Sequence, residues 1–140
     1  MDYQPPPIVH TASVVVTGDS IATGIGHTSQ RGNDFSDAQW GRSPFAQLHL
    51  MHTRGYQYFQ GRDVILSTGI LNNEDWVSVE RQFQFLSESN PNTVKIVGTP
   101  FAEYNDRLSA LCSEYNFVFL GGYSAGPDGI HPVSYAGMGE

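Results

Sequence analysis

Short apolar runs alternate with helical patterns along most of this chain. Runs such as VVV at residues 14–16 and DVIL at residues 63–66 are rich in β-branched residues, which is typical of strands buried on both faces of a parallel sheet. The predicted strands are residues 13–16, 38–40, 63–67, 93–97 and 117–120. Because strands that alternate with helices are typical of βαβ units, the sequence predicts an α/β fold with a mostly parallel sheet of about five strands and helices on both faces.

Apolar residues recur at helical spacing in three segments. The predicted helices cover about residues 44–54, 76–89 and 104–115. The first has clear signals at both ends, since Ser43 and Pro44 fit the cap and first position of a helix and Gly55 fits its end. Residues 27–37 are polar and contain glycine, so we expect them to form a surface loop.

The length of 140 residues fits a single domain with one core. Residues 1–12 contain three consecutive prolines, and we expect them to form an extended lead-in to a folded domain at residues 13–140. Cys112 is the only cysteine, so no intrachain disulfide can form. It lies on the apolar face of its predicted helix, where we expect a small buried hydrophobic residue.

The net charge of -7 argues against nucleic acid or a membrane surface as a partner. Lys95 is the only lysine, and the arginines are scattered rather than clustered. No apolar run approaches the roughly 18 residues of a membrane span, and the first residues lack the features of a signal peptide. We therefore expect a soluble protein, cytoplasmic or virion-associated, that acts on a small uncharged molecule or a neutral polymer.

The strongest candidate for chemistry is the serine that follows the first strand. The valine run breaks into TGD and then Ser20, where glycine permits a sharp turn that presents the hydroxyl. Near the other end of the sequence, Asp128 and His131 stand three residues apart. A serine becomes an effective nucleophile when an imidazole accepts its proton and a carboxylate orients that imidazole. These three side chains are therefore a candidate triad.

The order of these motifs resembles that of the SGNH hydrolases, also called the GDSL family, and of compact members encoded by phages. The matching blocks are Gly18-Asp19-Ser20, Gly41, the turn at residues 69–73, and Asp128 with His131. The resemblance implies a flavodoxin-like three-layer α/β/α sandwich. It also implies that Ser20 is the nucleophile, His131 its general base and Asp128 the group that orients the histidine, with no cofactor and no metal.

The resemblance further implies an oxyanion hole for the negative charge that develops on the substrate. Its donors would be the backbone N–H groups of Ser20 and Gly41 and the side chain of Asn72. The family's third block is usually glycine, any residue, asparagine, whereas two residues separate Gly69 from the asparagines here. Asn73 is therefore an alternative to Asn72.

These features predict a serine esterase that hydrolyses acyl esters, acetyl esters in particular, on a small molecule or a carbohydrate. The alternative is a noncatalytic structural or binding module that keeps the fold within a larger assembly, such as a phage particle, or that self-associates. His49 and His52 lie one turn apart on a predicted helix. We interpret them as part of a plain helix face rather than a metal site, because no acidic ligand accompanies them.

Overall fold

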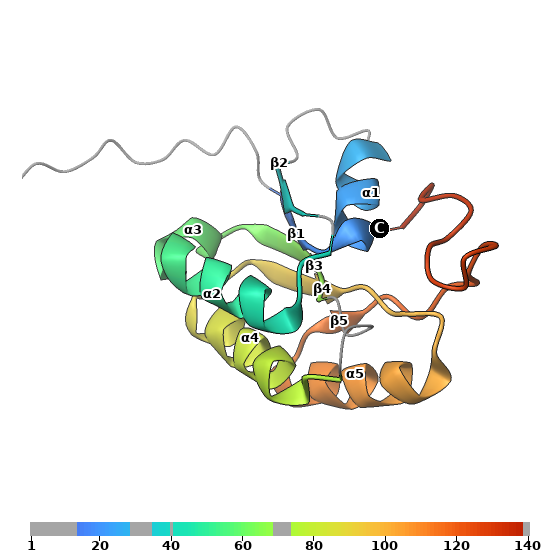
Figure 1. Cartoon of the computed structure of the whole chain (residues 1–140). Helices are drawn as coiled ribbons and strands as arrows, with labels where there is room; N and C mark the ends of the chain where they lie inside the picture. Colours follow the sequence, from blue (N-terminus) through green and yellow to red (C-terminus); the bar gives the residue numbers. More distant parts are fainter. Residues whose placement is uncertain (1–13, 29–34, 40, 69–73, 139–140) are drawn as a thin grey trace, which may run out of the picture.

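The structure of the chain, a computed structural model, describes residues 14–28, 35–39, 41–68 and 74–138 (Figure 1). The lead-in predicted at residues 1–12 lies outside these described residues. The described part of the chain forms a flavodoxin-like three-layer α/β/α sandwich around a parallel sheet, which confirms the predicted fold class.

Five parallel strands form one sheet in the order β2-β1-β3-β4-β5. The strands are β1 (Val14–Gly18), β2 (Phe35–Ala38), β3 (Asp63–Ser67), β4 (Thr93–Ile96) and β5 (Val118–Phe119). Strand β1 lies between β2 and β3. The chain therefore places β2 on one side of β1 and the later strands on the other side, so the strand order reverses at β1. In open α/β sheets, ligands bind beyond the carboxyl ends of the strands at such a reversal. Ser20 follows β1 at this edge.

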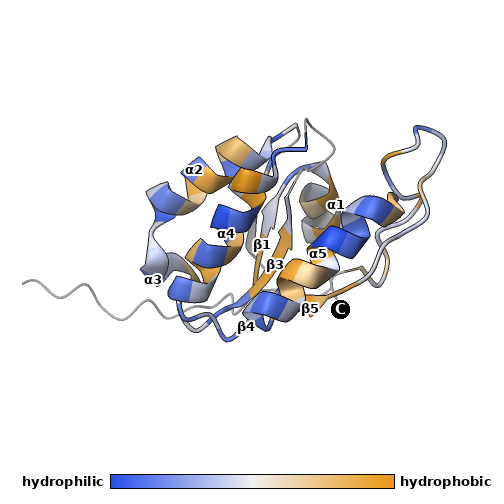
Figure 2. Ribbon diagram, turned by 90° about the horizontal axis from the view of Figure 1, so that it is seen from below, coloured by the Kyte–Doolittle hydropathy of each residue, from blue (hydrophilic) through white to orange (hydrophobic). Residues whose placement is uncertain are grey.

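Helices cover both faces of the sheet. They are α1 (Ser20–Thr28), α2 (Pro44–Arg54), the single turn α3 (Tyr56–Phe59), α4 (Trp76–Glu88) and α5 (Ala102–Tyr115). Figure 1 shows α1 on one side of the sheet and α4 and α5 on the other. The helices α2, α4 and α5 each have a hydrophobic and a hydrophilic side in Figure 2, as expected for helices that pack on a sheet.

Side chains that alternate along the strands divide the core into two clusters. Val15, Val64 and Leu66 belong to the larger cluster, which includes buried residues of α2 to α5. Val16 and Ile65 belong to the smaller one, with Ile21, Ala22 and Ile25 of α1. The segment after β5 also packs against the smaller cluster through Leu120, Tyr123, Tyr135 and Met138. Within residues 74–138, no helix follows β5.

The helix α1 and the strand β2 correct the predicted loop at residues 27–37. The helix extends to Thr28, and β2 begins at Phe35 rather than at residue 38. Two glycines and two threonines give the α1 sequence a low helix propensity, so burial against the sheet stabilises it. The position of β2 is set by its pairing with β1, which a short polar sequence does not reveal.

The other elements lie close to their predicted positions. Strand β3 has the predicted bounds, and α2 begins after its cap Ser43, whose hydroxyl accepts a hydrogen bond from the Ala46 N–H. The Gly55 N–H donates to the Met51 carbonyl at the end of α2. The predicted signals at both ends of this helix are therefore confirmed.

At Gly18, β1 approaches β3 so closely that there is no room for a side chain. The φ of +134° at Gly18 is unfavourable for residues with a side chain, and a Cβ there would lie 1.6 Å from the Ser67 carbonyl oxygen. The same oxygen accepts a hydrogen bond from the Asp19 N–H at 3.1 Å. The backbone can turn from β1 into α1 at this point because residue 18 has no side chain.

We predict that Gly18→Ala destabilises the fold far more than Gly61→Ala. Gly61 also has a positive φ, +71°, but a Cβ there meets no atom within 4 Å. The Gly61 variant should lose about 1–2 kcal/mol of unfolding free energy, and the Gly18 variant more than about 3 kcal/mol or its ability to fold. Urea denaturation followed by circular dichroism measures both, and equal losses would contradict the packing argument.

Candidate active site

Ser20 lies at the first position of α1, directly beyond the end of β1. The buried Asp19 carboxylate accepts hydrogen bonds from the backbone N–H groups of Ile21 at 3.0 Å and Ala22 at 3.5 Å. Asp19 therefore caps the helix and fixes the start of its first turn. The Ser20 side chain is partly buried, and its backbone N–H has no acceptor within the helix because it belongs to the first turn.

A chain of two hydrogen bonds joins Ser20, His131 and Asp128. The Ser20 Oγ lies 2.7 Å from His131 Nε2, although the two residues are 111 positions apart in the sequence. His131 Nδ1 lies 2.6 Å from Asp128 Oδ2. An ionised carboxylate can only accept, so Nδ1 carries the proton in this pair and Nε2 accepts from the Ser20 hydroxyl. The structure thus brings together the three predicted triad residues.

Asp128 is held by backbone donors as well as by the histidine. Its Oδ1 accepts from the Ile130 N–H at 2.9 Å and the His131 N–H at 2.8 Å. The Ile130 hydrogen bond first, and then those of His131, lower the pKa of Asp128 from 3.8 to about 2. The carboxylate, 53% of whose side chain is exposed to water, is therefore ionised at neutral pH.

The loop that carries Asp128 and His131 is tied both to itself and to the sandwich. The Gly126 N–H donates to the His131 carbonyl at 2.7 Å, and the Tyr123 hydroxyl donates to the Ile130 carbonyl at 2.7 Å. Burial raises the pKa of Tyr123, so its hydroxyl keeps the proton that it donates. These bonds restrict the position of the imidazole relative to the rest of the loop.

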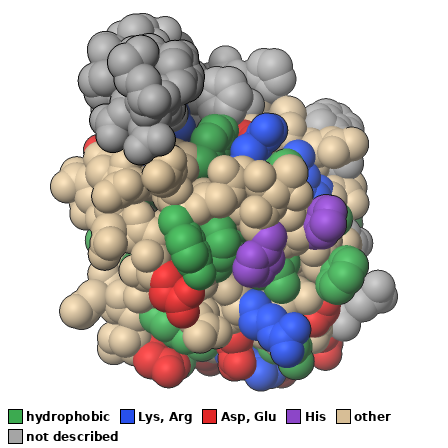
Figure 3. All heavy atoms as spheres, turned by 90° about the vertical axis from the view of Figure 1, so that its left-hand side faces the viewer, with side chains coloured by type: hydrophobic (Ala, Val, Ile, Leu, Met, Phe, Trp, Pro, Cys, Tyr) green, Lys and Arg blue, Asp and Glu red, His purple; other side chains and the backbone are tan. Residues whose placement is uncertain are grey.

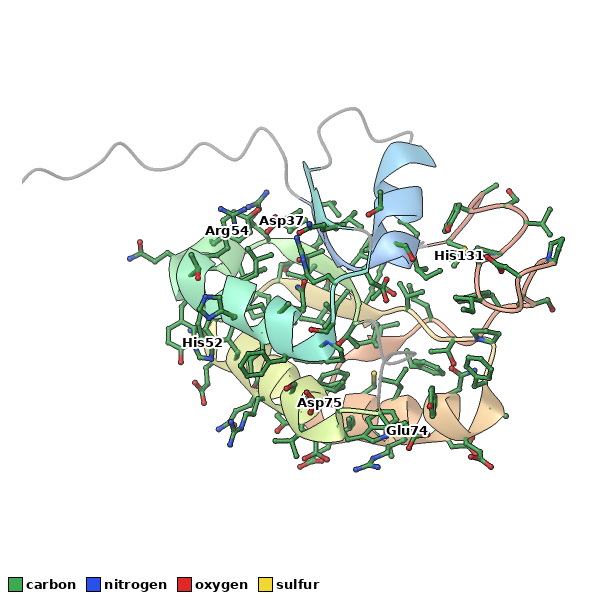
Figure 4. The ribbon with its side chains drawn as sticks, viewed as in Figure 1. Asp37, His52, Arg54, Glu74, Asp75 and His131 are labelled. Atoms are coloured by element: carbon green, nitrogen blue, oxygen red, sulfur yellow. The ribbon has the colours of Figure 1, made fainter. Side chains whose placement is uncertain are left out.

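Tyr135 connects the same segment to the helix that begins at Ser20. A Cβ at Gly24 of α1 would lie 2.2 Å from the ring carbon Cζ of Tyr135, so the ring rests against the helix backbone. Figure 4 shows His131 on the loop beside α1. The contact between Gly24 and Tyr135 therefore helps to set the distance between the serine and the histidine.

Gly41 lies on the loop that follows β2. Its φ is +72°, and a Cβ there would meet no protein atom within 4 Å. The start of this loop is held next to β1, because the Gln39 N–H donates to the Gly18 carbonyl at 3.0 Å. The loop thus begins beside the end of the strand that leads to Ser20.

A polar network fixes the other side of the Gly41 loop. Arg42 donates to the Asp37 carbonyl at 2.9 Å and to Gln47 Oε1 at 2.8 Å. Gln47 donates to the Thr17 hydroxyl, which itself donates to the Asp37 carbonyl. The Asp37 carboxylate forms a two-point ion pair with Arg54, and Figure 4 shows the two side chains together. The network links β1, β2 and α2 around the loop.

Asn72 and Asn73, the predicted side-chain donors of the oxyanion hole, lie outside the described residues. The end of β3, which leads to these asparagines, lies beside the residue that precedes Ser20. Ser67 and Thr68 are buried at the end of β3, and the Ser67 carbonyl accepts from Asp19, the residue before Ser20.

None of the remaining candidates from the sequence is part of the triad, although His49 borders a pocket that Gly41 also lines. His49 and His52 are exposed on α2. The His52 ring packs edge-on against Phe85, with 4.8 Å between the two ring centres. Among the described residues, no group of three or more histidine, cysteine or acidic side chains is placed to hold a metal. Cys112 is buried as predicted, and burial raises the pKa of its thiol to about 12, which keeps it protonated.

A cavity of about 500 Å³, which the sequence did not predict, lies next to the triad loop. It is bordered by Ile130 of that loop, by Phe101, Glu103 and Tyr104 around the start of α5, and by Glu74 before α4. Each of these residues lies at a helix start or in a turn. Their positions in the sequence carry no shared spacing, so only the folded chain reveals that they line one cavity.

Charged and apolar side chains are mixed on the face of the molecule seen in Figure 3. Basic, acidic, histidine and hydrophobic side chains are interspersed there, and the described residues form no continuous basic band on that face.

In the described ranges of the chain, no helix combines the length and the apolar character needed to cross a bilayer.

No protein-family model matches this sequence, and neither a curated protein nor a solved structure matches it significantly. The chemistry of the site therefore has to be inferred from its residues and geometry.

We predict that Asp128 titrates well below ordinary aspartates. Its pKa of about 2 lies below the unfolded value of 3.8, so its contribution to stability is complete above about pH 4 and is lost as the pH falls toward 2. Carboxyl ¹³C chemical shifts followed over pH 1.5–6 measure the titration, and urea unfolding at pH 5 and pH 2.5 measures the linkage. The advantage in stability of the parent over Asp128→Asn should shrink at the lower pH. A midpoint near 3.8 would contradict the hydrogen bonding described for this carboxylate.

Proposed function

We propose that the protein is a serine hydrolase that cleaves carboxylic esters through an acyl-enzyme on Ser20. The observation that carries this proposal is the continuous hydrogen-bond chain from Ser20 Oγ through His131 to Asp128, with lengths of 2.7 and 2.6 Å. A nucleophile, a base and an orienting acid at these distances are the parts that acyl transfer requires. The position of Ser20 at the carboxyl end of β1 supports the same function.

The first half of the proposed reaction forms the acyl-enzyme. Ser20 Oγ attacks the ester carbonyl carbon while its proton passes to His131 Nε2. The resulting tetrahedral intermediate collapses, the bond to the alcohol oxygen breaks, and the alcohol leaves with the proton from Nε2. Asp128 stays ionised throughout and stabilises the imidazolium, in line with its low pKa.

The second half regenerates the enzyme. A water molecule attacks the acyl carbon and gives a proton to His131 Nε2. The second tetrahedral intermediate then breaks its bond to Ser20 Oγ, which takes back the proton. The products are one carboxylic acid and the enzyme in its starting state.

The proposed oxyanion hole begins with the Ser20 N–H. This group belongs to the first turn of α1, and the amino end of a helix carries a partial positive charge of roughly half a unit. Both features favour a developing oxyanion. The second donor is the Gly41 N–H, and a loop fixed by the network of Arg42 and Gln47 supports a stable position for it. Asn72 is the proposed third donor.

Within this function, we propose membership of the SGNH hydrolases, supported by the order of the motifs and by the assembled triad. The proposed substrates are acetyl and similar short acyl esters of small molecules or carbohydrates. The noncatalytic alternative, a module of a larger assembly that keeps the fold, would require no hydrogen-bonded triad. The geometry at Ser20 and His131 therefore favours the enzyme.

We predict that the parent protein hydrolyses p-nitrophenyl acetate and that its serine is labelled by a fluorophosphonate. Ser20→Ala should lower kcat by roughly 10⁴-fold or more and abolish labelling, because the hydroxyl that would carry the acyl group is removed. The matched control is Ser113→Ala, which removes an exposed serine on α5 and should change neither result. A parent that neither turns over the ester nor reacts with the probe would favour the noncatalytic module.

We predict that Asn72→Ala lowers kcat for the same ester by roughly 10²-fold to 10³-fold, because one donor to the oxyanion is lost. Asn73→Ala serves as its matched control and should change kcat less than about threefold. Steady-state kinetics on both variants measures the difference. The reverse result would transfer the donor role to Asn73, and two small effects would remove the amide from the proposed oxyanion hole.

A further inference from the structure

We propose that Gln47 is a positioning residue for the oxyanion hole and that it holds the Gly41 N–H in place through Arg42. This role rests on the proposed esterase function and adds to it a residue on which the rate depends. Gln47 contacts neither the ester nor the reacting atoms. Its effect is carried by the turn that contains Gly41, by the hydrogen bonds of its amide and by its burial.

Gly41 is the third residue of a four-residue turn that begins at Gln39. The Arg42 N–H closes this turn by donating to the Gln39 carbonyl at 3.3 Å. Glycine suits the third position because its φ of +72° is unfavourable for residues with a side chain. The Gln39 N–H donates to the carbonyl of Gly18 at 3.0 Å, two residues before Ser20. The first end of the turn is therefore fixed to the strand that leads to the serine.

The other end of the turn is fixed by the side chain of Arg42. Its Nη1 donates to the Asp37 carbonyl at 2.9 Å and to Gln47 Oε1 at 2.8 Å, so both protons of this nitrogen are engaged. Burial lowers the pKa of Arg42, and the negative charges of Asp37 and Asp19 oppose this change. Because Asp19 precedes Ser20, its effect on Arg42 agrees with a turn that lies beside the serine.

Gln47 connects Arg42 to strand β1. Its Nε2 donates at 2.8 Å to the Thr17 hydroxyl, which donates to the Asp37 carbonyl at 3.0 Å. Arg42 can only donate, so the amide oxygen has to face it and the amide nitrogen has to face Thr17. Gln47 is 1% exposed and Thr17 is 0% exposed, so bulk water does not compete for these bonds. The amide therefore has one orientation, which relates Arg42 to the sheet.

The Gln47 amide is not required to fill space. Methionine has a similar volume and length, and it avoids the cost of burying an amide. In Gln47→Met, Thr17 and Arg42 each keep their hydrogen bond to the Asp37 carbonyl, so neither loses its last protein partner. We therefore expect this substitution to affect the position of Arg42 more than the stability of the fold.

The experiment measures hydrolysis of p-nitrophenyl acetate by the parent and by Gln47→Met. The variant should lower kcat roughly 10- to 100-fold, because a misplaced donor stabilises the oxyanion less well. Both half-reactions use the oxyanion hole, so KM should change less than about twofold. The thermal midpoint should stay within about 4 °C of that of the parent, as followed by circular dichroism. A kcat within about threefold of the parent would overturn the proposal.

The matched control is Gln82→Met on α4. Gln82 is 0% exposed, and its Nε2 donates at 2.8 Å to the Pro44 carbonyl at the start of α2. Among the described residues, no hydrogen bond joins it to Arg42 or Thr17. This variant should lose at least as much stability as Gln47→Met but keep kcat within about threefold. An equal fall in kcat in both variants would assign the effect to the placement of α2 and overturn the proposal.

The route through Arg42 is tested by Arg42→Met, made alone and together with Gln47→Met. If Gln47 acts through Arg42, the double variant should have the kcat of Arg42→Met to within about twofold, because the link is already broken. Losses in kcat that multiply in the double variant would show that Gln47 acts by another route, and this would overturn the proposal.

A measurement without substrate separates this role from the proposed function. The order parameters of the Gly41 and Arg42 amides are measured by ¹⁵N relaxation in the parent, in Gln47→Met and in Gln82→Met. They should be about 0.85 in the parent and the control, and below about 0.6 in Gln47→Met. This loss of order would support the role of Gln47 even if the parent hydrolysed no ester and the proposed function failed. Unchanged order parameters together with an unchanged Gly41 amide shift in Gln47→Met would overturn the role, even in an active esterase.

Discussion

The close approach of Gly18 to the Ser67 carbonyl is the contact on which the arrangement of the site depends. It lets the backbone leave β1 beside β3, and it lets the Asp19 N–H bond to the same carbonyl. Asp19 then caps α1 and places Ser20 at its first position. The three residues Gly18, Asp19 and Ser20 therefore link the pairing of β1 with β3 to the start of α1. A rigid sheet edge therefore determines where the hydroxyl lies.

The histidine reaches this edge through the segment after β5. Leu120, Tyr123 and Tyr135 pack on the cluster that α1 also covers. Among the described residues, no helix follows β5, and this segment itself packs on that face. The segment that completes the second layer also carries Asp128 and His131. Core packing and the geometry of the triad therefore depend on the same contacts, including that of Tyr135 with Gly24.

Charge is distributed to match the proposed chemistry. Backbone donors keep Asp128 ionised next to the imidazole, and the amino end of α1 faces the proposed oxyanion with its partial positive charge. The cavity beside Ile130 is instead lined by Glu74 and Glu103.

The sequence by itself determined the α/β class, the parallel sheet, most strand and helix positions, and the candidate triad. Valine runs, helical periodicity and the signals at Ser43 and Gly55 are local, so they can be read without the fold. The helix α1 and strand β2 were decided by tertiary structure, because burial and pairing outweighed weak local propensity. The 2.7 Å contact of Ser20 with His131 and the cavity of Phe101 and Glu74 also required the fold, since they join residues far apart in the chain.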